Sequence, residues 1–453
     1  MENKPLYEQY RREITALDDQ ELARINRPFT WWGRLISSAF FIMSFFALWH
    51  FTLRSGRHWY LLGGIMFIYS VIKFICAIMY RPSRNELTQD YQVSVILTCY
   101  NEKPESLVMI LENIANLDYN VKEILFIDDG SDDTSALDIA HSFADAHFNT
   151  ISSPNFSIHR FEENQGKRQA LKKGIPLATG DYVFLLDSDS QIRQDALTEL
   201  LRPFEDGETT SVVGHIGVLN KNKFLKKLQE VTYFAAFQIG RTAQSITGST
   251  VICSGAFSIH KKENILKMID KFDEEKIFGI RLTSGDDRSM TSFSQKTGGK
   301  TRYQATAYCE TEVPVTWQSF VRQRRRWQRS TYIGGITTFL RVFPRRPIYL
   351  FWVFGESYLW VVSIIIYVYY LTQRDFIIDY DLIDIILFWL IMTYKHNIFY
   401  ALYKPLYFII MPLYSLVYGL FLIFIRIYAL ITITNDKWGT RQKIANEEEH
   451  TYM

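Results

Sequence analysis

The chain lacks the features that define small secreted or zinc-stabilised proteins. It has four cysteines in 453 residues, and no two of them form a C-x-x-C pair, so the sequence predicts neither a zinc site nor a disulfide framework. We expect these residues to be reduced and mostly buried: Cys76, Cys99, Cys253 and Cys309. The N-terminus also lacks the basic region and early apolar core of a cleaved signal peptide, so the hydrophobic segments are expected to be permanent.

The chain also lacks an appreciable excess of positive or negative charge. It has 50 basic and 48 acidic residues, which leaves a net charge of only +2, and we expect no nucleic-acid partner. We find neither an internal repeat nor a low-complexity tract. Aromatic residues, in contrast, make up 15% of the chain, a level that favours membrane-facing helices.

Five apolar runs flank a less hydrophobic centre. After a polar stretch at 1–33, runs at 35–53 and 59–80 each have about the ~20 residues needed to span a bilayer. A turn containing Arg54 and Arg57 separates them, so they predict a transmembrane hairpin. Three further runs follow the centre, at 348–371, 377–403 and 406–431.

The centre of the chain alternates strand and helix patterns. Buried strands are predicted at 93–98, 124–127, 182–186 and 212–217. Helices are predicted at 104–117, 135–146, 167–178 and 195–204. This order is typical of an α/β domain, Rossmann-like, with a mostly parallel sheet covered on both faces. Ligands of such sheets bind beyond the carboxyl ends of the strands.

Two of these strands end in acidic residues. The strand at 182–186 runs into Asp187-Ser-Asp189, where carboxylates at i and i+2 point to one side and could ligate a divalent cation that also holds a diphosphate. A solvated loop is the alternative. The strand at 124–127 runs into Asp128 and Asp129, which could accept hydrogen bonds from a base or ribose, or could cap the next helix.

Charged residues also stand at two predicted turns. Lys167 and Arg168 begin a helix whose dipole they oppose, which favours a phosphate site over a purely structural role. Asp286 and Asp287 follow Gly285, and either could serve as a general base for a sugar hydroxyl with Arg288 helping to position it. A simple turn is the alternative for this second motif.

A third group follows Pro314, where the absence of Gly and Pro from 316 to 332 predicts a helix. Gln323, Arg326 and Trp327 then share one face at i, i+3 and i+4, where they could bind a diphosphate or a sugar ring. Arg324 and Arg325 should point away, toward the membrane surface. A basic membrane anchor explains the run equally well when it is taken alone.

Together these motifs resemble those of the processive, inverting family-2 glycosyltransferases, which include cellulose, chitin and hyaluronan synthases. Bacterial, streptococcal-type hyaluronan synthases are the most similar members. The resemblance rests on the acidic and Gln-x-x-Arg-Trp motifs above and on the segments 164–168, 243–248, 253–255 and 438–441.

The resemblance implies a GT-A-like domain and a role for each residue. Asp128 or Asp129 would hold uridine, Lys167 and Arg168 would contact the nucleotide or its diphosphate, and Asp287 would be the base. Asp189, with Asp187 nearby, would bind Mg²⁺ or Mn²⁺. The acceptor or product site would contain Cys253, Gly255, Gln323, Arg326 and Trp327, and Trp438 and Arg441 would close over the nucleotide.

The implied reaction is polymerisation of UDP-sugars at the plasma membrane, with growing polysaccharide and membrane lipids as further partners. Hyaluronan, from UDP-GlcNAc and UDP-glucuronate, is the favoured product. A GlcNAc homopolymer, a glucose and glucuronate polymer, or a non-processive transfer to a lipid phosphate are alternatives. A receptor or transporter with a degenerate domain should have lost carboxylates, and none is missing.

These inferences divide the chain into parts. We expect a cytoplasmic extension (1–33), a transmembrane hairpin (34–80), the cytoplasmic catalytic domain (88–310) and amphipathic interface helices (311–347). Two transmembrane helices (348–403), an interfacial helix bent near Pro412 (404–432) and a cytoplasmic tail with a gating loop (433–453) would follow. The catalytic domain and the tail must share one side, so the number of crossings between them must be even.

Overall fold

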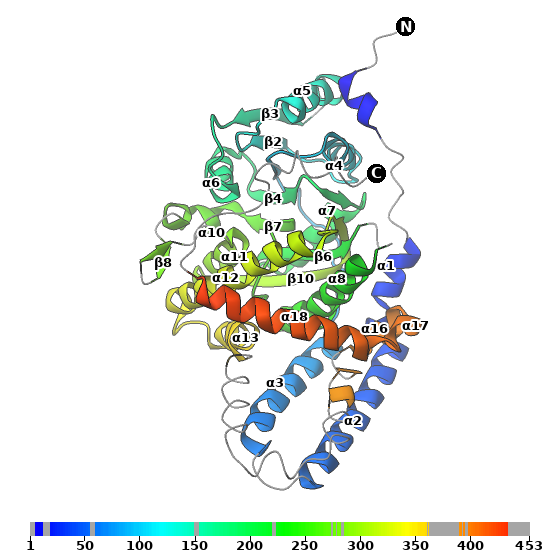
Figure 1. Ribbon diagram of the computed structural model, residues 1–453. Coiled ribbons are helices and arrows are strands. Elements are labelled where there is room, and N and C mark those ends of the chain that lie inside the picture. The colour runs from blue at the N-terminus through cyan, green and yellow to red at the C-terminus, as the bar shows by residue number, and fades with distance from the viewer. Residues whose placement is uncertain are drawn as a thin grey trace, which may run out of the picture.

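The computed structural model describes residues 5–11, 19–54, 59–148, 154–219, 223–272, 275–277, 279–281, 285–359, 361, 389–391, 393–394 and 397–433. Figure 1 shows an α/β domain from which a helical hairpin projects, with further helices where the two meet. The predicted α/β domain between hydrophobic segments is therefore confirmed in its outline.

A single mixed sheet organises the α/β domain. Its strands lie in the order β3-β2-β1-β4-β7-β6-β10-β5. Their bounds are β1 Val93–Cys99, β2 Glu123–Asp128, β3 Asn155–Arg160, β4 Tyr182–Asp187, β5 Ser190–Ile192, β6 Thr209–Val218, β7 Phe257–Lys261 and β10 Lys300–Thr311. Strand β7 is antiparallel to both of its neighbours and β5 is antiparallel to β10, while the other pairs are parallel. A separate hairpin joins β8 Lys276–Ile277 to β9 Ile280–Arg281.

Helices cover both faces of the sheet, as predicted. Those of the domain are α4 Pro104–Ala115, α5 Ser135–His147, α6 Lys167–Leu177, α7 Ala196–Leu201, α10 Lys262–Leu266 and α11 Asp286–Lys296, with 3-10 turns η3 Arg202–Asp206 and η5 Ile269–Phe272. Side chains of β1 alternate between two cores. Val95 and Leu97 pack with α4, α5 and α7, whereas Ile96 packs with α6, α10 and α11.

The predicted hairpin consists of α2 Trp31–Arg54 and α3 Trp59–Met79. Phe41 stacks on Phe74 with ring centroids 4.0 Å apart, and Arg34 donates to the Tyr80 carbonyl at 2.8 Å. The Tyr80 hydroxyl then donates to the carbonyl of Tyr303 in β10, at 2.9 Å. The hairpin is therefore joined directly to the sheet.

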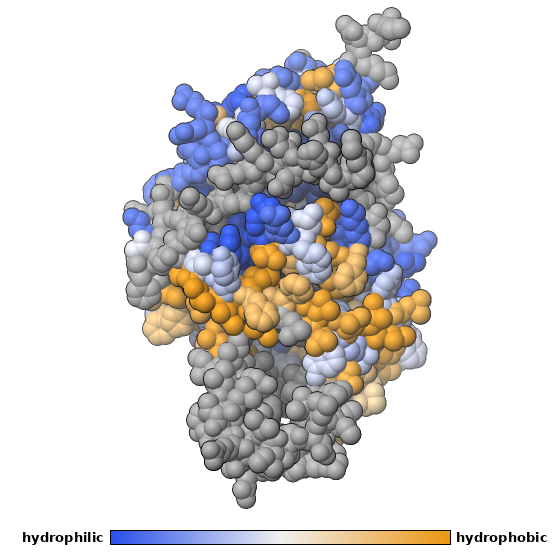
Figure 2. All heavy atoms as spheres, in the orientation of Figure 1, coloured by the Kyte–Doolittle hydropathy of each residue, from blue (hydrophilic) through white to orange (hydrophobic). Residues whose placement is uncertain are grey.

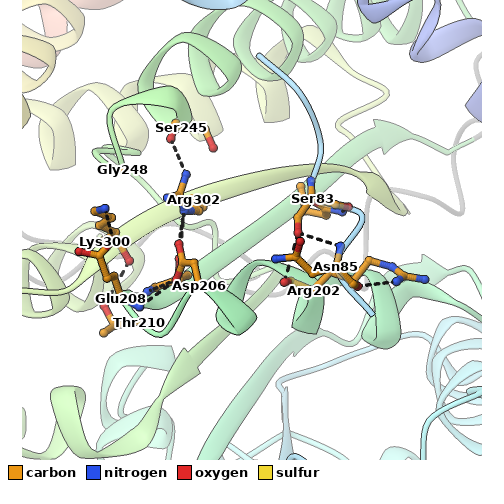
Figure 3. A network of polar contacts seen from close by, with 12 residues as sticks. Ser83, Asn85, Arg202, Asp206, Glu208, Thr210, Ser245, Gly248, Lys300 and Arg302 are labelled. Atoms are coloured by element: carbon orange, nitrogen blue, oxygen red, sulfur yellow. Dashed lines mark hydrogen bonds and ion pairs between the residues drawn. The ribbon is translucent and has the colours of Figure 1, made fainter. Parts of the chain in front are cut away.

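Polar contacts hold the segment that leaves the hairpin (Figure 3). Ser83 donates through its hydroxyl to the Arg202 carbonyl at 3.2 Å, and Arg202 donates through its guanidinium to the Asn85 carbonyl at 2.7 Å. Beside them, Arg302 of β10 pairs with Asp206 at 2.9 Å. This network anchors residues 83–85 against η3, so the domain begins in a fixed position relative to the hairpin.

The N-terminal extension packs on the α/β domain. Its elements are η1 Leu6–Tyr10, α1 Asp19–Ile25 and η2 Arg27–Phe29. Tyr7 lies edge-on to Phe143 of α5 at 5.2 Å, and Arg11 pairs with Glu112 of α4 at 2.7 Å. The extension therefore reaches the helices on one face of the sheet.

The remaining helices lie between the domain and the hairpin. They are α8 Phe224–Ala235, the π-helix η4 Ala236–Arg241, α9 Thr242–Ile246, α12 Trp317–Val342, α13 Pro347–Ser357, α16 Ile398–Tyr403, α17 Pro405–Phe408 and α18 Met411–Ile431. The helix predicted from Thr316 onward is α12, and Thr316 caps it by accepting from the Ser319 N–H at 3.2 Å. The predicted break near Pro412 is also confirmed, because α17 ends before it and α18 begins with it in its first turn.

Helix α18 has one face on protein and an apolar face on the outside. Tyr418 and Ile425 pack with Phe320 of α12, whereas Phe424 is 72% exposed. Figure 1 shows α18 running across the hairpin direction, and Figure 2 shows apolar side chains gathered in a band over it. Among the described residues, α18 alone is long and apolar enough to cross a membrane by length and composition; 31–47 and 68–79 are shorter apolar stretches.

Parts of the predicted organisation lie outside the described residues. They are most of the two proposed crossings between 348 and 403 and all of the tail from 434, which contains Trp438 and Arg441. Their membrane roles remain predictions.

The contact between Gly285, just before α11, and α12 gives a first testable prediction about stability and activity. Gly285, before α11, and Gly279, between β8 and β9, both have positive φ, 88° and 78°, where alanine is strained by about 1–2 kcal/mol. A Cβ at Gly285 would also overlap the Ser330 hydroxyl of α12, while at Gly279 nothing in the described part of the chain lies within 4 Å. We expect Gly285→Ala to lower the melting temperature and the initial rate more than Gly279→Ala does.

A second variant separates the two causes. Ser330→Ala added to Gly285→Ala should recover the part of the loss that the overlap causes. Equal losses in the two single variants would show that backbone strain alone matters.

Candidate functional site

Three neighbouring strands bring the predicted acidic residues to one edge of the sheet. Strand β1 lies between β2 and β4, and its register pairs Cys99 with Asp128 and Thr98 with Asp187. Asp128 and Asp187 therefore end the strands on either side of β1. This is the carboxyl edge where a parallel sheet binds ligands.

At that edge Lys167 links two of the predicted motifs. Its ammonium forms an ion pair with Asp187 and donates to the Gly255 carbonyl at 3.3 Å. A Cβ on Gly255 would be 3.4 Å from both the Lys167 Nζ and the Asp286 Oδ2, so these groups face one another. Burial lowers the pKa of Lys167, but the carboxylates of Asp187 and Asp286 outweigh it and raise the pKa overall. Lys167 is thus a permanent cation at the strand ends.

Asp287 is the carboxyl group whose environment suits a base. Burial, reinforced by the neighbouring Asp286 carboxylate, raises the pKa of Asp287 to about 6 against the opposing pull of Arg288 and Lys167. A carboxyl group with this pKa is ionised at neutral pH and is more basic than an ordinary aspartate. Arg288 itself is buried under α12, because a Cβ on Gly334 would lie 2.8 Å from its Cδ.

The loop at 247–256 between α9 and β7, the Cys253 loop, is bonded to α11, the helix that contains Asp287. Thr291 donates through its hydroxyl to the Asp287 carbonyl at 2.7 Å and accepts from the Cys253 N–H at 2.8 Å. Burial raises the pKa of the Cys253 thiol to about 12, so the thiol stays neutral and is unsuited to nucleophilic chemistry. Through Thr291 the loop containing Gly255 is fixed relative to Asp287.

Asp187 and Asp189 fit a divalent cation that shares its ligands with a substrate. Asp187 ends β4, and Asp189 follows in the turn, where its Oδ1 accepts from the Thr311 hydroxyl at 3.2 Å. Within the described residues no three His, Cys, Asp or Glu side chains form a closed metal cage. Mg²⁺ commonly uses one or two carboxylates and takes its other ligands from phosphate and water, so this donor set suits Mg²⁺ or Mn²⁺.

Asp128 and Asp129 have internal partners. Asp128 accepts from the Ser131 N–H at 3.2 Å, and Asp129 accepts from the N–H groups of Gln165 and Gly166 at 2.9 and 2.8 Å. Burial raises the pKa of Asp129 to about 6 despite these donors. Asp129 thereby fixes the turn that presents Lys167. A direct contact of either carboxylate with uridine remains a prediction.

The side chain of Arg168 does not lie beside that of Lys167 at the strand ends. Its side chain is buried and donates to the Phe272 carbonyl at 2.9 and 2.6 Å, pairs with Glu275 and lies over the Phe272 ring. Adjacent residues at a helix start point in different directions, and this one points away from the strand ends. The geometry therefore does not support the predicted nucleotide contact of Arg168.

The Gln323, Arg326 and Trp327 face of α12 lies near α8. Trp327 is 6.3 Å from the Tyr233 ring, and the Gln323 Oε1 is buried with no hydrogen-bond partner among the described residues. The prediction that Arg324 faces the membrane surface is wrong. Arg324 is buried, with its guanidinium 4.6 Å from the Trp327 ring and 5.7 Å from that of Tyr418 in α18. It joins α12 to α18 because α18 covers that side of the helix.

Sequence patterns did not single out two residues that follow β1. Asn101 has a positive φ of 47° and donates to Asp132 at 2.8 Å, and Glu102 accepts from the Ser188 hydroxyl at 2.6 Å. Glu102 thus lies beside the Asp187-Ser188-Asp189 turn. Its position three residues after a buried parallel strand was the signal that could have identified it.

Comparisons with known proteins agree with this geometry. Profiles described as "Glycosyl transferase family 2" and "Glycosyl transferase family group 2" match residues 94–269 and 182–433. Hyaluronan synthase of Streptococcus pyogenes serotype M1 is 31% identical over 386 residues, which cover 84% of this chain and 90% of that protein. An N-acetylglucosaminyltransferase of Rhizobium sp. (strain N33) is 30% identical over 57% of this chain and 56% of its own.

A solved structure has the same fold. It is a mannosyltransferase from Pyrobaculum calidifontis in complex with GDP-Man and Mn²⁺, with a TM-score of 0.53 and 20% identity, and the match covers 83% of this chain and all of that one. The arrangement of strand-end carboxylates, the matching profiles and the relatives lead to one conclusion: the chain is an enzyme of glycosyltransferase family 2.

Proposed function

We propose that this glycosyltransferase is a processive, inverting synthase that polymerises UDP-GlcNAc and UDP-glucuronate into hyaluronan. The observation that carries the proposal is the meeting of Lys167, Asp187, Gly255 and Asp286 beside Asp287 at the carboxyl edge of the sheet. The 31% identity to streptococcal hyaluronan synthase over 84% of the chain supports this product over the alternatives.

The proposed reaction is a single displacement. Asp287 accepts the proton of the acceptor hydroxyl as that oxygen attacks the anomeric carbon, and the bond from this carbon to UDP breaks on the opposite side. Configuration at the carbon therefore inverts. Lys167 offsets negative charge on the departing diphosphate, and Mg²⁺ or Mn²⁺ held by Asp187 and Asp189 would supply further neutralisation when bound.

The acceptor end would lie between the Cys253 loop and α12. Trp327 offers a flat apolar surface for a terminal sugar, and the Gln323 Oε1 is a buried acceptor suited to a sugar hydroxyl. Arg326, on the same face, would bind near the diphosphate. Trp438 and Arg441 would complete the site from the tail.

The membrane would keep the polymer attached between additions. In this proposal α2 and α3 span the plasma membrane, the α/β domain is cytoplasmic, and α18 lies along the inner interface with its apolar face toward lipid. A chain threaded through the membrane part cannot diffuse away, so each product is the next acceptor.

Product analysis tests the proposal. Membranes containing the enzyme are incubated with UDP-GlcNAc alone, UDP-glucuronate alone, both together, and UDP-glucose with UDP-glucuronate. We expect high-molecular-mass polymer only from the GlcNAc and glucuronate pair, and its complete digestion by a hyaluronan-specific lyase. Polymer from UDP-GlcNAc alone would indicate a chitin-like product, and labelled lipid without polymer would indicate the non-processive alternative.

The environment of Asp287 sets the expected pH dependence. A base works in its ionised form, and a pKa of about 6 means that this form is lost as the pH falls from 7 to 5. We therefore expect kcat/KM to decline with an acid limb near pH 6. Asp287→Asn should lower polymer formation by about 10²–10⁴ while UDP-sugar binding survives. Near-normal turnover of this variant would assign the base to another residue.

Two tryptophans of α12 form a matched pair for the acceptor site. Trp327→Ala should stop elongation, because it removes the surface on which the acceptor sugar would stack. Trp317, which is 41% exposed and stacks on Phe421 of α18, serves as the control. Trp317→Ala should retain elongation, measured as polymer per folded enzyme. Similar losses in both variants would favour a purely anchoring role for α12.

A further inference from the structure

Glu275 is a buried carboxylate that the proposed chemistry does not use. It immediately precedes β8, is 6% exposed, and pairs with two guanidinium groups, Arg168 of α6 and Arg341 of α12. It also accepts from the hydroxyl of Ser289 in α11 at 2.6 Å. One carboxylate therefore contacts three helices.

The two guanidinium groups that pair with Glu275 have further contacts with aromatic rings and hydroxyl groups. Arg168 lies 4.2 Å from the Phe272 ring, and Arg341 lies 4.6 Å from the Phe293 ring and donates to the Ser292 hydroxyl. Arg168 also donates to Ser289 at 3.3 Å. Both cations and the anion are thus held by hydrogen bonds and ring faces away from water, where ion pairs depend strongly on geometry.

Each partner of Glu275 belongs to a helix that also carries a residue of the proposed reaction. Arg168 follows Lys167, which pairs with Asp187 at the strand ends. Ser289 lies two residues after Asp287 in α11. Arg341 belongs to α12, the helix that carries Gln323, Arg326 and Trp327. The helices that carry the donor contact, the base and the acceptor face therefore all contact one carboxylate.

We propose that Glu275 is a positioning residue that sets the relative placement of Lys167, Asp287 and the acceptor face of α12. Its two guanidinium partners would repel each other without it, so α6 and α12 can approach α11 in this arrangement only around the Glu275 carboxylate. Displacements of about 1 Å between reacting groups can cost about 10² in rate. The inference rests on the proposed roles of Lys167 and Asp287.

The least disruptive test shortens the side chain and keeps its charge. Glu275→Asp retains the anion between Arg168 and Arg341 but cannot reach all three helices at once. We expect its melting temperature to stay within a few degrees of the wild type. Its kcat should fall about tenfold or more, and UDP released per sugar incorporated should rise, because misaligned acceptor lets water attack the donor.

Glu263→Asp is the matched control. Glu263 of α10 pairs at 2.6 Å with Lys267, which follows the last residue of that helix, and both side chains are more than half exposed. This variant makes the same chemical change in the same region and should leave kcat and the UDP ratio unchanged. A purely structural role of Glu275 would alter the amount of folded enzyme and the melting temperature but not the UDP ratio.

A second variant removes the charges altogether. Replacing Arg168, Glu275 and Arg341 together by Met keeps an uncharged, apolar interior, which buried ion clusters often tolerate without loss of stability. We expect this folded variant to keep the raised UDP ratio. A wild-type kcat and UDP ratio in either Glu275→Asp or the triple variant would overturn the proposal, whereas activity of Asp287→Asn would instead refute the assigned base.

Discussion

Charge that is withdrawn from water must be balanced where it lies, and this constraint shapes the catalytic end of the molecule. Lys167 is compensated by Asp187 and Asp286, whereas at Asp287 burial and the Asp286 carboxylate outweigh the positive charges of Arg288 and Lys167. The pKa of Asp287 is raised for this reason. The same proximity that makes the site costly to fold makes one of its carboxyl groups basic.

The balance is achieved by segments that are distant in sequence. Lys167 comes from the start of α6, Asp187 from the end of β4, Gly255 from the loop before β7, and Asp286 from α11. No pair of these segments could form the site alone. The sheet provides the frame because its parallel strands end side by side, and the helices then supply their termini to that edge.

The central part of the fold could be predicted because its strands are buried on both faces and therefore have uninterrupted apolar sequences. Strands β1, β2, β4 and β6 were found in this way. Strand β3, partly exposed at the sheet edge, and β10, which mixes apolar with polar residues, have weaker patterns and were missed. The short strands β5 and β7 were missed as well. Lys167 and Arg168 show the same limit at the site, since the partners that draw their side chains apart, Asp187 for one and Phe272 and Glu275 for the other, are distant in sequence.

The apolar outer face of α18 would make the proposed reaction depend on the lipid surface. In the proposed membrane arrangement, α18 at the inner lipid boundary would hold α12, and with it the proposed acceptor face, close to the phosphate headgroups. Anionic lipids concentrate protons at such a surface, within about a Debye length of ~8 Å at physiological salt. The ionisation of Asp287, whose pKa is raised to about 6, would then depend on the local lipid composition as well as on the bulk pH.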